Sequence, residues 1–278
     1  MISTSAASNG ETSHTQLPRR RRRGIPGALL STPVRYLGLE SARQLRNLRG
    51  LIFTFAVPLL MLLVFGSAYG SGGVIDRVTG LPWVVVTTIQ MAGYGGMMAA
   101  LGQAFNIVTE RSLGWNRQLR LTPLTGAGYL LSKVVSALAV ALVSIVLLIV
   151  VAVVVLGAKL SFLGWTMATL GLWIGVVPFA LIAVLIGQFA KPSYAQPLFL
   201  IVFFGLAILG GLWIPLQIMP SWVSNVAQAV PSYWLNRLGQ MGASVSGNAL
   251  EPVLILLGWT IALAVLISWR YKRDAARS

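Results

Sequence analysis

Apolar runs of about 20 residues recur along this chain. A run of that length is what an α-helix needs to cross the hydrocarbon core of a bilayer. Hydrophobic residues make up 56% of the chain and charged residues only 10%, far below the charged share of a soluble domain. The sequence therefore predicts an all-α, polytopic membrane protein.

Six membrane crossings are expected from the positions of these runs. We place them at residues 51–69, 83–107, 128–156, 162–188, 197–214 and 251–270. Charge supports this number, because Lys and Arg collect on the cytoplasmic side of membrane proteins. With the N-terminus inside, six crossings leave 18 of the 21 Lys and Arg residues inside, and one crossing more or fewer destroys this asymmetry. We therefore expect a multi-pass protein of the plasma membrane with both termini in the cytoplasm.

The formal net charge of +15 resembles that of a nucleic-acid-binding protein, but the same charge is typical of the cytoplasmic side of a membrane protein, and no nucleic-acid partner is expected. Residues 1–32, with five arginines at 19–23, are predicted to be a disordered basic cytoplasmic tail. A targeting signal is disfavoured because no apolar run follows the arginines directly. Residues 33–270 form the predicted transmembrane domain, and residues 271–278 a second basic cytoplasmic tail.

The first part of the transmembrane domain, residues 33–49, has the pattern of an amphipathic helix. Four apolar side chains share one stripe at helical spacing: Val34, Leu37, Leu45 and Leu48. Such a helix is expected to lie along the inner membrane surface. We assign Glu40 in this helix, and Arg273 at the other end of the chain, to peripheral cytoplasmic surfaces.

Residues 214–241 precede the last crossing and are apolar and aromatic, but prolines interrupt them too often for a spanning helix. One or two short helices in the outer leaflet, with aromatic side chains at headgroup depth, are predicted here. The residues that mark this segment are Met219, Pro220, Trp222, Pro231 and Tyr233.

No pattern of catalytic or cofactor-binding residues is found in the sequence. The one histidine, His14, falls in the predicted tail, there is no cysteine, and no cluster of His, Asp and Glu has metal-ligand spacing. The dipeptide Gly-Lys is absent, which excludes a P-loop for ATP in this chain. No catalytic residue, metal or cofactor is therefore predicted.

The second crossing carries polar side chains at Thr87, Thr88, Gln90, Gln103 and Asn106. Two interpretations stay open: hydrogen bonds between helices, which is the commoner role of such residues in membranes, or the lining of a substrate path. The same segment pairs Gly95 with Ala99, and Gly96 with Ala100, a small-x-x-x-small spacing that predicts close helix packing.

A charged stretch, residues 109–133, separates the second crossing from the third and is predicted to be cytoplasmic. A short helix after Thr109, broken by Pro123, would make this stretch compact. From the residues alone, a handle for a cytoplasmic partner and a solvated loop are equally supported.

The stretch "ERSLGWNRQLRLTPLTGAGYLLSKVV" resembles the signature of ABC-2 type permeases, and "IMPSWVSNVAQAVPSYWLNR" resembles a second element of that family. The resemblance spans about residues 40–270, and the absence of a large outer domain makes the chain similar to drug- and polysaccharide-export permeases, daunorubicin-resistance types included. It implies that the charged stretch contains a coupling helix, that residues 33–49 are the family's interfacial connecting helix, and that two permease chains pair. The Arg-rich tail is not part of the family pattern.

The resemblance also implies a partner: a separate ATP-binding cassette subunit that binds ATP and Mg²⁺. The residues that would couple to it are Glu110, Arg111, Gly114, Trp115, Arg117, Leu119, Arg120 and Pro123. The function that follows is a non-catalytic permease subunit that moves a hydrophobic or amphipathic substrate (a drug, antibiotic, lipid or glycan) out of the cell. The alternatives are an ion- or proton-coupled carrier, which a membrane core without charges disfavours, and a scaffold that transports nothing.

Topology gives the first testable prediction. Because the chain has no cysteine, single cysteines can be labelled with a membrane-impermeant maleimide. Cysteines at Ser71, Ser161 and Ser244 should react from outside the cell, and those at Ser112, Ser193 and Ser278 only after permeabilisation. Reaction at position 112 from outside would overturn both the orientation and the coupling helix.

Overall fold

The computed structural model describes residues 28–70, 75–76, 79–114, 125–214, 216, 219–244 and 249–275. Apart from one bridge between Ile75 and Pro82, the regular elements of these residues are helices. They are α1 (Ala28–Leu45), α2 (Leu48–Gly70), α3 (Trp83–Ser112), α5 (Gly126–Val155), α6 (Phe162–Gly175), α7 (Val177–Phe189), α8 (Pro192–Leu209), α9 (Ser221–Ala227), α10 (Pro231–Ser244) and α11 (Leu250–Ala275). The all-α expectation is confirmed, while most of the predicted tail 1–32 lies outside the described residues.

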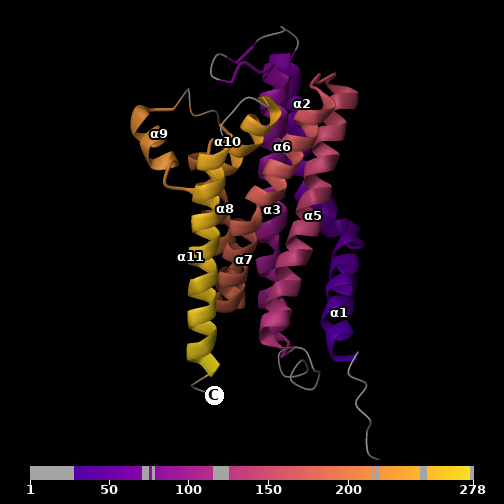
Figure 1. Ribbon diagram of the computed structural model, residues 1–278, viewed down its shortest axis with the longest axis vertical. Helices are drawn as coiled ribbons and strands as arrows, with labels where there is room; N and C mark the ends of the chain where they lie inside the picture. The colour runs from indigo at the N-terminus through magenta and orange to yellow at the C-terminus, as the bar shows by residue number, and fades with distance from the viewer. Residues whose placement is uncertain are drawn as a thin grey trace, which may run out of the picture.

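Six helical stretches within the described residues are long and apolar enough to cross a membrane, as predicted. Five of them are the helices α2, α3, α5, α8 and α11, and the sixth is α6 followed by α7. Figure 1 shows them side by side along the long axis of the molecule. The fifth crossing differs from its predicted range because α8 already begins at Pro192 and ends before Gly210. Proline suits the first turn of a helix, where its missing N–H would have no partner.

Helix α3 is the centre of the bundle. Its apolar window is 89% buried, against 18% for α2 and 22% each for α8 and α11. Small residues allow this close packing, as predicted: a Cβ on Gly95 would lie 2.8 Å from Leu148 Cδ1, and one on Gly96 would lie 3.0 Å from Ile145 Cδ1. Helix α5 can therefore approach the α3 backbone closely, and α2, α8 and α11 cover the outside.

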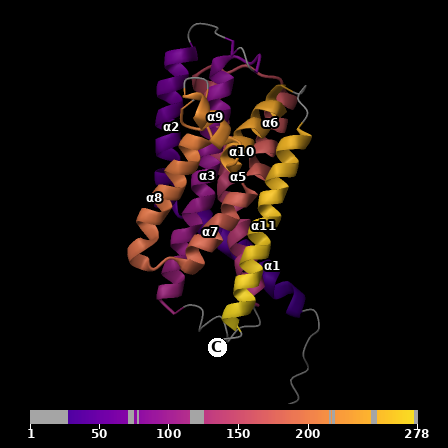
Figure 2. The same cartoon turned by 90° about the vertical axis from the view of Figure 1, so that its left-hand side faces the viewer.

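A helix is present at the predicted N-terminal position, but its ends differ from those expected. It begins at Ala28 rather than Pro33 and stops at Leu45, and α2 starts after a turn at Arg46 and Asn47. The Asn47 side chain accepts a hydrogen bond from the backbone N–H of Gly50, which caps the start of α2. We call this turn and the helix ends beside it the elbow. In both views α1 runs beside the lower part of the bundle (Figures 1 and 2), where it packs against α5.

Two short helices, α9 and α10, lie between the fifth and sixth crossings, in agreement with the expected short helical segment. Pro220 immediately precedes α9, and Pro231 is the first residue of α10. Helix α10 packs against α6, and its Trp234 donates an indole N–H bond to the carbonyl of Gln228. Trp222 is exposed, which leaves it free to contact lipid, but its depth in a bilayer stays a prediction.

The ends of the helices sort into two groups. Figure 1 shows the start of α1, the C-terminal end of α11, the end of α3 and the start of α5 at one end of the bundle, and α9 and α10 toward the other. Figure 2 shows the same separation after a quarter turn. An even number of crossings requires this arrangement. The positive-inside rule predicts that the end with α1 and α11 faces the cytoplasm, and we call it the inner end.

The packing of α3 on α7 generates a stability prediction. A Cβ on Gly187 would lie 2.6 Å from the Cβ of Ile107, a branched stem that cannot move without the helix. Gly187→Ala should therefore lower the free energy of unfolding by about 1–3 kcal/mol, the usual cost of overpacking. Gly205→Ala is the matched control, because nothing lies within 4 Å of the new methyl group. Thermal unfolding in detergent measures both, and equal midpoints would contradict the described contact.

Candidate functional site

A buried group of charges joins three helices at the inner end. Lys133 of α5 is completely buried, and its Nζ donates to Glu40 Oε1 at 2.6 Å and to Glu110 Oε1 at 2.7 Å. Glu40 comes from α1 and Glu110 from the last turns of α3. We call these residues the Lys133 cluster. Because the two carboxylates sit on different helices, one lysine fixes α1, α3 and α5 to one another.

Further side chains complete the cluster. The Tyr129 hydroxyl donates to Glu110 Oε2 at 2.7 Å, and Gln44 Nε2 donates to Glu40 Oε1 at 3.3 Å. The exposed Arg43 lies 3.7 Å from one carboxylate and 3.6 Å from the other. Two cations therefore face two carboxylates, which reduces the cost of removing these charges from water.

The ionisation of Glu40, which lies in α1 and outside the six spans, follows from these contacts. Burial by itself raises the pKa of its carboxyl, but the hydrogen bond and positive charge of Lys133 outweigh burial, with Gln44 and Arg43 adding to the effect. The net result is a pKa below the ordinary value, so that Glu40 is a carboxylate at neutral pH. The expectation that Glu40 occupies a peripheral surface is wrong, because only 4% of the residue is exposed.

The cluster lies at the base of the charged stretch. Helix α3 ends at Ser112, and Gly114 follows in the left-handed conformation (φ 72°) that favours glycine. Helix α5 starts at Gly126, after Thr125 caps it by accepting from the N–H of Gly128. Residues 115–124 between them, which include the predicted coupling residues Trp115, Arg117, Leu119, Arg120 and Pro123, lie outside the described residues. Both anchors of that segment are thus held by the cluster.

Arg111 joins the end of α3 to another helix. Its guanidinium donates to the backbone carbonyl oxygens of Gly187 at 3.2 Å and Ala190 at 2.7 Å, at the C-terminal end of α7. Carbonyl groups there have no partner within their own helix, and a cation also suits the helix dipole. The side chains of Glu110 and Arg111, which we expected to reach toward a partner, are therefore engaged within this chain.

The polar residues of α3 divide into two groups. Toward the outer end, Gln90 Nε2 donates to the carbonyl of Gly211, and the hydroxyl of buried Thr88 donates to Val84 of its own helix. Thr87 is buried as well. Toward the inner end, Asn106 Nδ2 donates to Gln44 Oε1 at 3.3 Å. A hydrogen bond between helices, the first of the two interpretations, is thus found for Asn106, whereas Gln90 bonds to the turn that follows α8.

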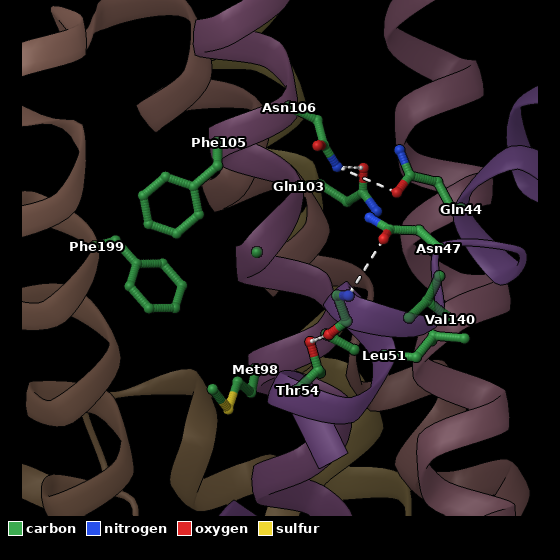
Figure 3. Close-up of a pocket in the computed structure, with 13 residues that line it drawn as sticks. Gln44, Asn47, Leu51, Thr54, Met98, Gln103, Phe105, Asn106, Val140 and Phe199 are labelled. Carbon is green, nitrogen blue, oxygen red and sulfur yellow. Dashed lines mark hydrogen bonds between the residues drawn. The ribbon is translucent and has the colours of Figure 1, made fainter. Parts of the chain in front are cut away.

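Gln103 and Asn106 also line a cavity of about 290 Å³, which we call the elbow pocket. The elbow between α1 and α2 forms one wall, and α3, α5 and α8 form the others. Figure 3 shows its amide side chains on one side and Phe105 and Phe199, whose ring centroids are 4.8 Å apart, on the other. The lining residues are Gln44, Asn47, Gly50, Leu51, Thr54, Met98, Ala99, Gly102, Gln103, Phe105, Asn106, Val140 and Phe199.

One side chain belongs to both the cluster and the pocket. Gln44 donates to Glu40 through Nε2 and accepts from Asn106 through Oε1. The amphipathic pattern of residues 33–49 contains a signal for this role: Glu40 and Gln44 lie three and seven residues after Leu37, on the apolar side of the helix. Polar side chains in that position indicate a buried partner, but the sequence does not identify it as Lys133 or Asn106.

The geometry described so far supports binding and mechanical coupling, and no group of three or more metal-ligating side chains occurs within the described ranges. The sequence profile of the family described as ABC-2 type transporter matches residues 38–241. The chain is also similar to YvfS of Bacillus subtilis (strain 168), a candidate transport permease by its name, with 26% identity over 239 residues. The alignment covers 85% of this chain and 96% of YvfS.

The Lys133 cluster generates a prediction about stability. Lys133→Met leaves two buried carboxylates without their shared cation, and the loss of one partner of a buried pair typically costs about 3–5 kcal/mol. The triple variant Lys133→Met, Glu40→Gln, Glu110→Gln removes the uncompensated charges and should recover most of that loss. Lys159→Met, at an exposed lysine, is the control. Thermal unfolding of the four proteins tests this, and a Lys133→Met variant as stable as the control would contradict the buried pairing.

Proposed function

The chain belongs to the ABC-2 type transporter family, and we propose that it is the membrane-spanning permease subunit of an ATP-binding cassette exporter. A separate subunit binds ATP and Mg²⁺ and hydrolyses the nucleotide, since this chain lacks a P-loop. The permease chain is not itself an enzyme. It pairs with a second permease chain, and the two move a hydrophobic or amphipathic substrate out of the cell.

The observation that carries this proposal is the position of the Lys133 cluster. It ties together both anchors of segment 115–124, through Glu110 on one side and Tyr129 and Lys133 on the other. A force applied to the segment therefore acts on α3, α5 and α1 together. Transfer of motion between a docked ATPase and membrane helices requires such a rigid base, because a flexible one would absorb the motion.

Arg111 extends the same base to the rest of the bundle. Its bonds to Gly187 and Ala190 connect the end of α3 to the turn between α7 and α8. Movement of segment 115–124 would thereby also reach the fourth and fifth crossings. We assign Glu110 and Arg111 to this bracing role, and contact with the ATPase to Trp115, Arg117, Leu119 and Arg120.

The substrate path is proposed to include the elbow pocket, through Gln103 and Asn106. The pocket adjoins α2 and α8, two helices that the rest of the chain covers little. A substrate dissolved in the inner leaflet, or a second permease chain, can therefore approach the same side of the molecule. Export rather than import follows from the drug- and polysaccharide-export permeases that the motifs resemble.

A proton-coupled carrier is the second candidate, and the buried carboxylates Glu40 and Glu110 are the observation that favours it. Their location weighs against it, because Glu40 lies outside the six spans, Glu110 lies in the last turns of α3, and the two share one lysine instead of forming a relay through the membrane. A transport assay in vesicles separates the two: an exporter needs ATP, whereas a carrier responds to a pH gradient without ATP.

Docking of the ATPase is tested by truncating the proposed anchors. Trp115→Ala combined with Leu119→Ala should weaken association, because removal of large buried anchors at an interface typically costs at least about 2 kcal/mol, or about 30-fold in affinity. Coupled ATP turnover should fall with it. The matched control is Trp222→Ala with Val226→Ala, two exposed apolar residues in α9. Co-purification and ATP turnover with the ATPase are measured for each variant, and normal values for the Trp115/Leu119 variant would mean that the segment is only a solvated loop.

A further inference from the structure

We propose that the elbow pocket binds the uncharged, hydroxyl-bearing head group of an amphipathic molecule, and that Gln103 and Asn106 recognise it. This inference rests on the proposed function and deepens it, since it specifies the class of substrate from the atoms that face the pocket.

The hydrogen bonds of Gln103 and Asn106 leave the amide nitrogen of the first and the amide oxygen of the second unused. Asn106 Nδ2 donates both to Gln44 Oε1 and to Gln103 Oε1, the latter at 3.1 Å. Within the described part of the chain, Asn106 Oδ1 and Gln103 Nε2 take part in no hydrogen bond, although both residues line the pocket. A hydroxyl group donates and accepts at the same time, as does an amide, so either satisfies both atoms. A sugar offers several hydroxyls at neighbouring positions and fits such a pair well.

The lack of ionisable residues in the pocket lining excludes charged head groups. None of the residues that line the pocket is ionisable, and the charges of Glu40 and Lys133 are already satisfied within the cluster. A carboxylate, phosphate or ammonium group in the pocket would lose water without gaining a counter-ion, which is strongly unfavourable. The pocket therefore selects a neutral polar group over a charged one.

Size and apolar surface determine how the rest of the molecule is placed. A volume of about 290 Å³ is at the lower end for ligand sites, so the pocket holds a head group and not a whole amphiphile. Phe105, Phe199 and Met98 form the apolar wall opposite the amides (Figure 3). An alkyl or aromatic portion next to the head group would pack on these side chains and continue toward the weakly covered α2 and α8.

Protection of a single cysteine tests this proposal. Thr54→Cys places a thiol in the pocket lining of a chain without other cysteines, and the full chain is studied in phosphatidylcholine nanodiscs. The probes share a dodecyl chain and carry maltose, trimethylammonium or carboxylate as head group. Dodecyl maltoside should slow the reaction with N-ethylmaleimide by about tenfold, which corresponds to about 1.4 kcal/mol, because its bound head group covers the thiol. The two charged probes should have little effect.

The most decisive test is a substitution that changes which probe protects the cysteine. Gln103→Glu keeps an oxygen to accept from Asn106 and replaces the free donor by a carboxylate. Protection by the maltoside should fall, and protection by the trimethylammonium probe should rise. Gln196→Leu, at an exposed amide of α8 outside the pocket lining, is the control and should leave the maltoside effect unchanged.

Each outcome decides the question. Equal protection by all three probes would show that the pocket binds only the alkyl chain, and no protection by the maltoside, or an unchanged preference in Gln103→Glu, would also overturn the proposal. The experiment contains no ATPase. A chain that binds the maltoside but associates with no ATPase would therefore contradict the proposed function and leave this inference standing, whereas an ATP-driven complex without head-group selectivity would do the reverse.

Discussion

The burial of one ammonium group between two carboxylates is the interaction on which the inner half of this protein depends. An ammonium without water around it is tolerated only where anions and hydrogen bonds replace the water, and Lys133 finds both through Glu40 and Glu110. Neither carboxylate belongs to its own helix. The lysine therefore has its full set of partners only when α1, α3 and α5 are assembled, and this requirement sets the position of each helix relative to the other two.

Two kinds of contact hold the helices together in different parts of the bundle. The middle of the bundle is held by close packing of apolar and small side chains on α3, where glycine lets α5 approach. The inner end is held by directional polar contacts, those of the Lys133 cluster and of Arg111. Apolar packing tolerates small sliding motions of helices, whereas charge-assisted hydrogen bonds define one geometry. The proposed function requires the first property along the substrate path and the second at the proposed contact with the ATPase subunit.

The sequence predicts the general architecture well because its signals are strong and local. Hydropathy and the distribution of positive charge predict six crossings, and the structure has six candidate spans. Helix ends are predicted less well, as the elbow shows: a polar turn at Asn47 interrupts what reads as one continuous amphipathic helix. The role of Glu110 is missed for a different reason. Its hydrogen-bond partners Tyr129 and Lys133 lie 19 and 23 residues away in the chain, and a charge next to a predicted loop looks solvent-exposed until its neighbours in space are known.

The dual role of Gln44 has a consequence for how such a protein can diversify. Because one amide completes both the charge cluster and the pocket wall, a substitution that adapts the pocket to another substrate at this position also disturbs the helix anchorage. Gln103 contacts the pocket without touching the cluster, so it can change with fewer side effects. Adaptation to new substrates should therefore proceed mainly through α3 and α8, while the elbow stays under the constraint of two tasks at once.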